Sequence, residues 1–285
     1  MPSLTVPAYA KLNLSLDVLG RRPDGYHDLR MVMQSVTLAD ELTVTVSPGH
    51  GVTIRTSLPF LPNDQRNLAA AAALRFLEYT GTDCAVELRL RKSVPVCAGM
   101  GGGSSDAAAV LRALNRLTGA DLPVAELTRL GEAVGSDVPY CVLGGTALAE
   151  GRGELLTPLP PLPPCTIVVC KPSFPISTPA LFAALAGIKL RRRPDTAGLL
   201  DALACRDLTG VAQRMYNVFE DVLPSRQART VTEIKGQLVA GGALGACMSG
   251  TGPTVFGLFD DPAAAEQTAG GLRRDYDDVF LTEPV

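Results

Sequence analysis

The chain has 285 residues, of which 46% are hydrophobic and 19% are charged. This balance is typical of a globular protein with a substantial apolar core and excludes a largely disordered chain. The formal net charge of −3 gives no electrostatic reason to expect nucleic acid or a membrane as a partner. The N-terminus lacks a basic segment followed by an apolar run, and no apolar stretch reaches about 18 residues, so we expect a soluble, cytoplasmic protein.

The cysteines and histidines do not form a metal-binding pattern. The seven cysteines are scattered without a CxxC pair, and the only histidines are His27 and His50. A Cys/His zinc site therefore lacks its usual ligand spacing. We interpret the cysteines as reduced thiols that serve as small hydrophobic residues.

Alternating apolar residues predict strands in the first hundred residues. Period-two repeats run over 12–18, 42–46 and 86–90. Lys11 stands at the start of the first repeat, where a lysine that points inward is costly unless it has a partner.

Two helices are expected in the same part of the chain. Asn67 can cap the first helix, an alanine-rich run carries it, and Gly81 can end it. The second helix should begin just after the glycines at 101–103, continue through leucines at helical spacing, and stop at Gly119.

The best candidate for a domain boundary is the segment 157–164, where five of eight residues are proline. Such a segment cannot form a helix or an inner strand, so we expect an extended connector between a domain of residues 1–156 and one of residues 157–285. Mixed strands and helices in two halves indicate an α+β fold of two domains, with the active site in the cleft between them.

The second half continues the mixed pattern. Residues 166–169 predict a buried strand, and residues 179–186 predict a short helix. The basic run at 189–194 is interpreted as a solvated face or a mobile loop, and we assign it no site.

The most informative segment is PVCAGMGGGSSD at 95–106, directly before the second predicted helix. Its glycines remove the side chains that would keep a ligand from the backbone, and they bring N–H groups to a helix N-terminus that favours an anion. Ser104 and Ser105 can cap the helix or offer hydroxyls to a phosphate. The segment lacks GxxxxGK[ST] and GxGxxG, which argues against a Walker loop and a dinucleotide fold. A flexible turn with a good cap is the alternative interpretation.

Three motifs together resemble the GHMP kinases. Pro95 to Ala108 resembles the second signature of this superfamily, CMSGTGPTVFGLF at 247–259 resembles the third, and AKLNLSLDVLGRRPDGYHDL at 10–29 agrees in order and spacing. Within the superfamily, DGYH at 24–27, GSDVP at 135–139 and STPALF at 177–182 look like the 4-diphosphocytidyl-2-C-methyl-D-erythritol kinases. Tyr9 departs from the proline that usually precedes Ala-Lys in that family.

This resemblance implies transfer of the ATP γ-phosphate, with Mg²⁺, to the 2-hydroxyl of 4-diphosphocytidyl-2-C-methyl-D-erythritol, a small-molecule substrate of non-mevalonate isoprenoid synthesis. It makes Asp137 the catalytic base and Lys11 the partner that orients the hydroxyl, and leaves open which of them acts more directly. From the residues alone, Lys11 equally fits an exposed strand lysine, and Asp137 a turn or cap residue.

The resemblance also assigns binding residues. Tyr26 and Phe182 match a pair that stacks on cytosine, His27 a reader of the cytosine edge, Asn13 a contact near the erythritol, and Thr178 a contact to diphosphate or sugar. Without it, Tyr26 and His27 fit an exposed turn. Either Ser104 or Ser105 is a candidate for the metal, and the acidic ligand is not identified. The phosphates of ATP should lie on Pro95, Val96, Cys97, Ala98, Gly99, Met100, Gly101, Gly102, Gly103, Ser104 and Ser105.

Two other functions and one local alternative stay open. The chain could be another GHMP kinase that acts on homoserine or a sugar, or a silent nucleotide-binding protein of the same fold. Gly250 and Gly252 could form a second glycine turn at the phosphates, or only a tight turn before a strand at 254–259. The sequence gives no sign of an oligomeric state.

Overall fold

The computed structural model describes residues 1–186, 188, 190 and 192–285. The chain divides into two compact units, and neither unit is a single continuous segment. Unit 1 consists of Met1–Ala10, Ala39–Val96 and Gly101–Gly144. Unit 2 consists of Lys11–Leu38, Cys97–Met100 and Gly145–Val285. The division at residue 157 that the sequence suggests stays a prediction.

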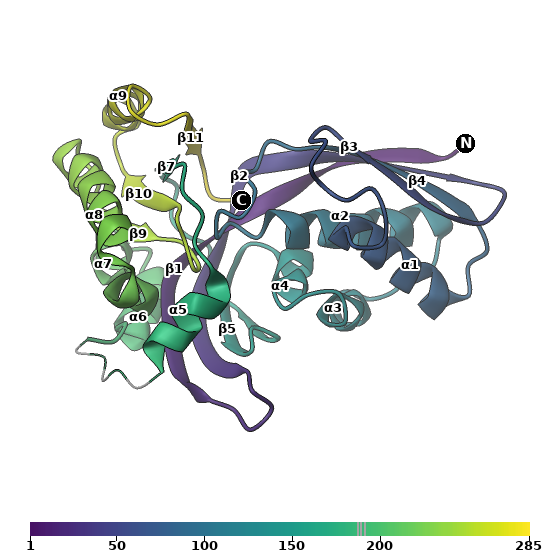
Figure 1. The fold of residues 1–285 in the computed structure, drawn as a ribbon, viewed down its shortest axis with the longest axis horizontal. Helices are drawn as coiled ribbons and strands as arrows, with labels where there is room; N and C mark the ends of the chain where they lie inside the picture. The colour runs from purple at the N-terminus through teal and green to yellow at the C-terminus, as the bar shows by residue number, and fades with distance from the viewer. Residues whose placement is uncertain (187, 189, 191) are drawn as a thin grey trace. The chain divides into compact units, whose positions relative to one another are not determined.

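Unit 1 combines a sheet with helices on one of its faces (Figure 1). It contains the N-terminal part of β1 and the C-terminal part of β2, which continue into unit 2. The bounds of these elements are β1 Ser3–Arg21, β2 His27–Ser47, β3 Gly51–Thr56, α1 Leu68–Thr80, β4 Ala85–Arg91, α2 Gly102–Thr118, α3 Val124–Glu132 and α4 Val138–Leu143.

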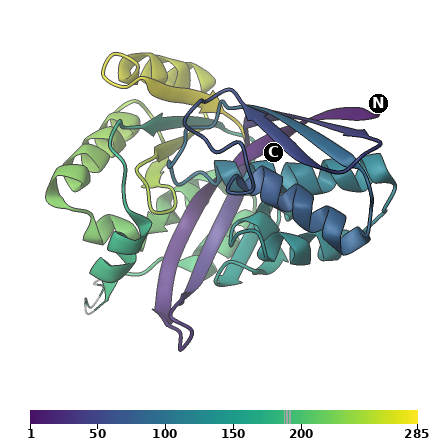
Figure 2. The same cartoon turned by 45° about the vertical axis from the view of Figure 1, so that its right-hand side comes forward.

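In this sheet β4 lies between β3, which is parallel to it, and β2, which is antiparallel. The helices α1 and α2 lie side by side, and α1 also packs on β3 and β4 (Figures 1 and 2). The predicted caps of the first helix are confirmed, because the Asn67 side chain accepts a hydrogen bond from Ala69 N and Gly81 ends the helix in the left-handed conformation. Gly119 likewise ends α2.

Unit 2 contains a second sheet in addition to the remaining parts of β1 and β2. The bounds of its elements are β5 Thr146–Gly151, β6 Leu155–Pro158, β7 Thr166–Lys171, α5 Thr178–Leu185, α6 Thr196–Ala204, α7 Leu208–Arg214, β8 Tyr216–Asn217, the 3₁₀ helix η1 Val218–Val222, α8 Ser225–Ala240, β9 Gly245–Met248, β10 Val255–Phe259, α9 Pro262–Leu272 and β11 Asp278–Thr282.

The second sheet has the strand order β11-β7-β10-β9 and is antiparallel throughout. The helices α8 and α9 pack against it (Figure 2). In the first sheet β5 pairs with β2, and β8 pairs with β1 in parallel, so that Ser15 lies opposite Tyr216. The predicted strand at 166–169 and helix at 179–186 correspond to β7 and α5.

Strand β1 differs from the amphipathic strand that its alternating pattern suggests. The apolar residues at 12, 14, 16 and 18 are buried, but Lys11, Asn13, Ser15 and Asp17 on the opposite face are buried as well. Both faces of the strand are therefore covered from residue 10 to residue 18. A buried polar face needs hydrogen-bond partners, and some of these partners belong to the candidate site.

The predicted connector is an edge strand in part. Residues 155–158 form β6, which pairs only with β5 among the described strands, and 159–164 have no helix or strand. Proline is tolerated at such an edge because the ladder needs no inward N–H there. The basic run at 189–194 lies partly outside the described residues. Its Arg193 is described and donates a 2.6 Å hydrogen bond to the buried Asp17, so this residue is not simply a solvated side chain.

Of the seven cysteines, Cys141, Cys170 and Cys247 are buried, whereas Cys97 and Cys205 are exposed and do not serve as core residues. Of the described helices, none is both long and apolar enough to cross a membrane.

Candidate active site

Two glycine turns from distant parts of the chain pack against each other in unit 2. The first is the Cys97–Met100 part of the glycine loop, and the second is the turn at 249–252 in the third signature. The Ser249 hydroxyl donates a 3.0 Å hydrogen bond to Gly99 O and accepts one of 3.2 Å from Asn13 N. Met100 O accepts a hydrogen bond from Lys11 N. One serine therefore ties both turns to β1.

Only glycine fits at the point where the two turns meet. Gly99 and Gly250 have φ angles of +74° and +57°, which side chains rarely adopt. A Cβ on Gly99 would overlap the carbonyl oxygen of Ser249, and a Cβ on Gly250 would lie 2.9 Å from the carbonyl oxygen of Gly99. The close approach of Gly250 to Gly99 therefore requires glycine at both positions, and the turn also leads directly into β10. Whether it lies at the phosphates of a nucleotide stays a prediction.

Lys11 and Asn13 lie on the same face of β1, two residues apart. The Lys11 ammonium donates a 2.8 Å hydrogen bond to Asn13 Oδ1, and both side chains are buried. Asn13 Nδ2 points to Met31 Sδ at 3.4 Å. A buried ammonium is costly to desolvate, so its place on this strand, beside the glycine turns, indicates a use for its charge.

Aromatic rings from three segments of unit 2 come together. His27, at the start of β2, stacks on Phe182 of α5 with ring centroids 4.7 Å apart. Phe182 in turn meets Phe219 edge to face at 4.9 Å. Tyr26 projects from the hairpin loop with 54% of its surface exposed, and its ring carries the guanidinium of Arg152 at 5.2 Å. The structure thus pairs Phe182 with His27, whereas Tyr26 has another partner.

The start of α5 is joined to the second glycine turn. Thr178, the first residue of this helix, shares a 2.8 Å hydrogen bond with the Thr251 hydroxyl. Among the expected substrate residues, Thr178 and Asn13 therefore both contact this turn, while His27 and Phe182 contact each other through their rings.

The remainder of the glycine loop belongs to unit 1, where it opens helix α2. Gly101 is the N-cap residue and no side chain caps the helix, so the expected capping by Ser104 or Ser105 is wrong. Ser105 is buried and donates a 2.6 Å hydrogen bond to Tyr9 O instead. The N–H groups of the first helical turn have no partner within an α-helix, and here they start with glycines.

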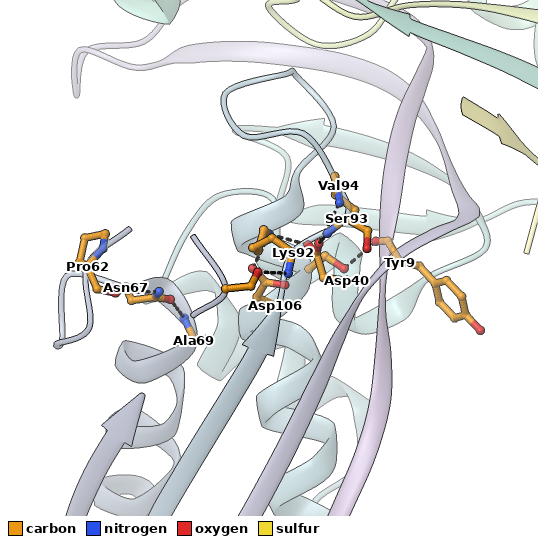
Figure 3. Close-up of polar contacts among 11 residues, drawn as sticks. Tyr9, Asp40, Pro62, Asn67, Ala69, Lys92, Ser93, Val94 and Asp106 are labelled. Atoms are coloured by element: carbon orange, nitrogen blue, oxygen red, sulfur yellow. Dashed lines mark hydrogen bonds and ion pairs between the residues drawn. The ribbon is translucent and has the colours of Figure 1, made fainter. Parts of the chain in front are cut away.

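A buried charged cluster lies next to the first turn of α2 (Figure 3). The Lys92 ammonium lies between Asp40 and Asp106, at 2.5 and 2.8 Å from their carboxylate oxygens. Asp40 also accepts hydrogen bonds from the N–H groups of Ser93 and Val94. A Cβ on Gly102 would lie 3.3 Å from Lys92 Nζ, so the cluster underlies the first residue of α2.

Asp106 is the member of this cluster whose hydrogen bonding is incomplete. Its Oδ1 atom is buried without a hydrogen-bond partner. Burial raises the pKa of Asp106 to about 7, with Asp40 adding to the rise and Lys92 opposing it. The pKa of Lys92 is raised, because the attraction of Asp106 and Asp40 outweighs the opposing effect of burial. Two carboxylates share one ammonium here, so one of them gains by holding a proton.

Asp137 is also in unit 1, where it precedes α4 as its N-cap residue and is half-buried. Its side chain does not cap that helix, so the cap interpretation is wrong for the carboxylate although the position is correct. Arg112 of α2 holds the opposite end of α4 by a 2.5 Å hydrogen bond to Cys141 O.

Sequence reasoning missed several residues that build the site. Ser249 was inside a recognised motif, but its bonds to Gly99 and Asn13 were not foreseen. Asn217 and Glu220, which hold the second glycine turn, carry no local signal. The partners Asp40 and Lys92 likewise stand far apart in the sequence.

In unit 2, two glycine turns pack against each other beside the buried Lys11, and in unit 1 the rest of the glycine loop opens α2. Residues 67–145 match the family of the GHMP kinases N terminal domain, and residues 199–278 match the GHMP kinases C terminal family. The chain belongs to the GHMP kinases.

Several proteins similar to this chain belong to a narrower group of kinases within this family. A 4-diphosphocytidyl-2-C-methyl-D-erythritol kinase of Clostridium botulinum is 41% identical over 282 residues, which cover 99% of this chain and 100% of that one. One of Exiguobacterium sibiricum is 43% identical over 98% of this chain and 97% of that one. A crystal structure of 4-(cytidine 5'-diphospho)-2C-methyl-D-erythritol kinase is 35% identical, with a TM-score of 0.83 and 99% coverage of both chains. The homoserine kinase of Cytophaga hutchinsonii has a TM-score of 0.77 at 22% identity over 99% of this chain and 95% of that one, and shares the fold.

Proposed function

We propose that this protein transfers the γ-phosphate of ATP to the 2-hydroxyl of 4-diphosphocytidyl-2-C-methyl-D-erythritol in the non-mevalonate route to isoprenoids. The observation that carries the proposal is the ring contact between His27 and Phe182, two residues expected from the family to receive cytosine. The full-length identity of about two residues in five with kinases of that name supports the same substrate over homoserine or a sugar.

The cytidine end of the substrate is assigned to the aromatic residues. A base offers a flat π-face to stack on, and Tyr26 is the exposed ring that can take it, with Phe182 as the second wall. His27 reads the cytosine edge through its ring nitrogens. Thr178 and Asn13 bind toward the diphosphate and the erythritol.

The phosphates of ATP are assigned to the glycine loop, Pro95 to Ser105. The start of α2 offers backbone N–H groups and the positive end of a helix dipole, which is the general reason why anions bind there. The turn at 249–252 is bound to Gly99 through the hydroxyl of Ser249 and so supports the glycine loop.

The chemistry requires an aligned hydroxyl and an acceptor for its proton. The substrate oxygen forms a bond to the γ-phosphorus, the bond from that phosphorus to the β–γ bridging oxygen breaks, and ADP leaves. Asp137 takes the hydroxyl proton, and Lys11 orients the hydroxyl and stabilises negative charge. Asn13 holds the Lys11 ammonium in place for this role.

Mg²⁺ is the metal expected with ATP. The described residues contain no cluster of three or more His, Cys, Asp or Glu side chains that could hold a metal alone. This fits Mg²⁺, which binds with few protein ligands when a nucleotide supplies phosphate oxygens. Ser104 is the candidate hydroxyl, because the Ser105 hydroxyl is engaged with Tyr9. The ion supplies charge neutralisation at the phosphates.

A panel of acceptors tests the proposal. ADP release is followed in a coupled assay with the cytidyl substrate, homoserine, mevalonate and galactose, and phosphorus NMR identifies the phosphorylated hydroxyl. We expect turnover with the cytidyl substrate alone and a new phosphate monoester at the 2-position. Turnover with homoserine or galactose instead would overturn it, and ATP binding without turnover on any acceptor would indicate a silent nucleotide-binding protein.

A further inference from the structure

The segment Asn217–Glu220 contacts three parts of unit 2: strand β1, the aromatic ring of Phe182, and the backbone at the second glycine turn. Asn217 ends β8, which pairs with β1 at Leu16, beside the buried polar stretch of that strand. Two residues on, Phe219 meets the ring of Phe182. The side chain of Asn217 binds the carbonyl oxygen of Gly250 in the second glycine turn, and that of Glu220 binds the N–H of Met248 directly before it.

Asn217 is fully buried and uses its amide group in a way that no other orientation allows. Nδ2 donates to Met248 O at 2.8 Å and to Gly250 O at 2.7 Å, while Oδ1 accepts from Phe219 N at 3.0 Å. A flipped amide would place its oxygen against two carbonyl oxygens and its nitrogen against an N–H. Both amide protons are therefore committed to the turn.

Glu220 binds Met248, the residue directly before this turn. Its Oε1 accepts a 2.8 Å hydrogen bond from Met248 N, and its Oε2 is 2.5 Å from the ammonium of Lys235 in α8. Met248 is thus bound at its N–H by Glu220 and at its carbonyl by Asn217. The backbone that leads into Ser249 cannot rotate without breaking one of these bonds.

We infer that Asn217 is a positioning residue for the ATP phosphates: it sets the orientation of the turn at 249–252 and, through Ser249, that of Gly99 in the glycine loop. The inference rests on the proposed function for the identity of the ligand. The consequence is physical. Without the two N–H donors, the buried carbonyl of Gly250 loses its amide donor and that of Met248 keeps only the weak thiol donor of Cys247 at 3.5 Å, so the peptide units of the turn reorient to reach other partners.

The first test measures ATP and the acceptor separately. Asn217→Ala should raise the KM for ATP, and the Kd of a non-hydrolysable ATP analogue in calorimetry, by about tenfold. The KM for the cytidyl substrate should change less than twofold. Phe219→Leu should do the reverse, because it removes only the ring that meets Phe182. Asn217→Ser, which keeps one donor, should fall between wild type and alanine.

Asn115 offers a matched control. It also binds backbone at both ends of its amide, donating to Leu122 O at 2.9 Å and accepting from Leu122 N at 2.8 Å, but it lies near the end of α2. Asn115→Ala should lower the Tm and leave both KM values unchanged.

Three outcomes would overturn the inference. These are an unchanged ATP affinity in a folded Asn217→Ala protein, an equal loss for both substrates, and failure of both the alanine and serine variants to fold, which would make Asn217 a residue of the fold only. Because the calorimetric arm uses no acceptor, it gives its answer even if the proposed acceptor is wrong.

Discussion

The hydroxyl of Ser249 donates a hydrogen bond to the carbonyl oxygen of Gly99, which joins two motifs that stand 150 residues apart. The backbone of Ser249 also excludes a side chain at position 99, because a Cβ there would overlap the Ser249 carbonyl oxygen. Glycine at position 99 is therefore required for packing of the loop against the second turn, apart from any role toward a ligand.

Gly99→Ala should destabilise the protein and weaken ATP binding. The left-handed φ and the overlap with Ser249 together should lower the free energy of unfolding by about 2–4 kcal/mol. Urea unfolding and calorimetry with an ATP analogue measure the two effects. Gly236→Ala is the control, because Gly236 lies exposed within α8 with open space around it, and there alanine should stabilise by about 1 kcal/mol. Equal stability of the two variants would contradict the close packing of the turns.

Asp137→Asn should abolish most of the turnover. The amide keeps the shape of the carboxylate but cannot accept the proton, so kcat should fall by about 10²–10⁴. The KM for ATP should change little, because the base acts on the acceptor. Steady-state kinetics provide the test, with Asp201→Asn on the exposed face of α6 as a control. An asparagine variant with most of its turnover would assign Asp137 a structural role only.

Tyr26→Ala should weaken the cytidyl substrate selectively. Loss of a stacking ring is worth about 1–3 kcal/mol, which corresponds to roughly a ten- to hundredfold fall in kcat/KM for that substrate. The KM for ATP should hardly move. Tyr79→Ala is the matched control, since Tyr79 is also exposed with an arginine over its ring. A loss confined to ATP would place the cytidine elsewhere.

His27→Ala should add a different defect. Its ring stacks on Phe182, but its assigned role is to read the cytosine edge by hydrogen bonds. The variant should therefore lose its preference for cytidine over uridine analogues, which competition between the two acceptors measures. Retained preference with reduced turnover would leave His27 as a packing residue alone.

The buried cluster of Asp40, Lys92 and Asp106 makes the free energy of unfolding depend on pH. Between about pH 4 and pH 7 native Asp106 holds a proton that the unfolded chain has lost, so the free energy of unfolding should fall as pH rises through this window. The loss should reach a few kcal/mol at most. Urea unfolding of wild type and Asp106→Asn at several pH values checks this: the stability of wild type relative to the variant should decline from pH 4 to pH 7 and then level off. A constant difference would contradict the raised pKa.

Local pattern was sufficient for much of the fold and for part of the site. Asn67 and Gly81 mark the ends of α1 through their own backbone preferences, and period-two repeats indicate strands wherever one face is apolar. Motifs identified Lys11 and the glycine loop. The bonds that organise them could not be foreseen, because a residue such as Asn217 finds its carbonyl partners only after distant strands have paired. The burial of Asp17 on the polar face of β1 has the same origin.

The parallel pairing of β1 with β8 also has a consequence for synthesis of the chain. Ser15 leaves the ribosome long before Tyr216, its partner in the sheet. At about 5–20 residues per second, some ten to forty seconds of translation separate the two. During that time this edge of β1 remains open, with the polar stretch that begins at Lys11 not yet enclosed. A nascent chain stalled before residue 216 should therefore be a substrate for chaperones that hold unpaired strands, even though every residue expected to contact ATP in the glycine loop has already been made.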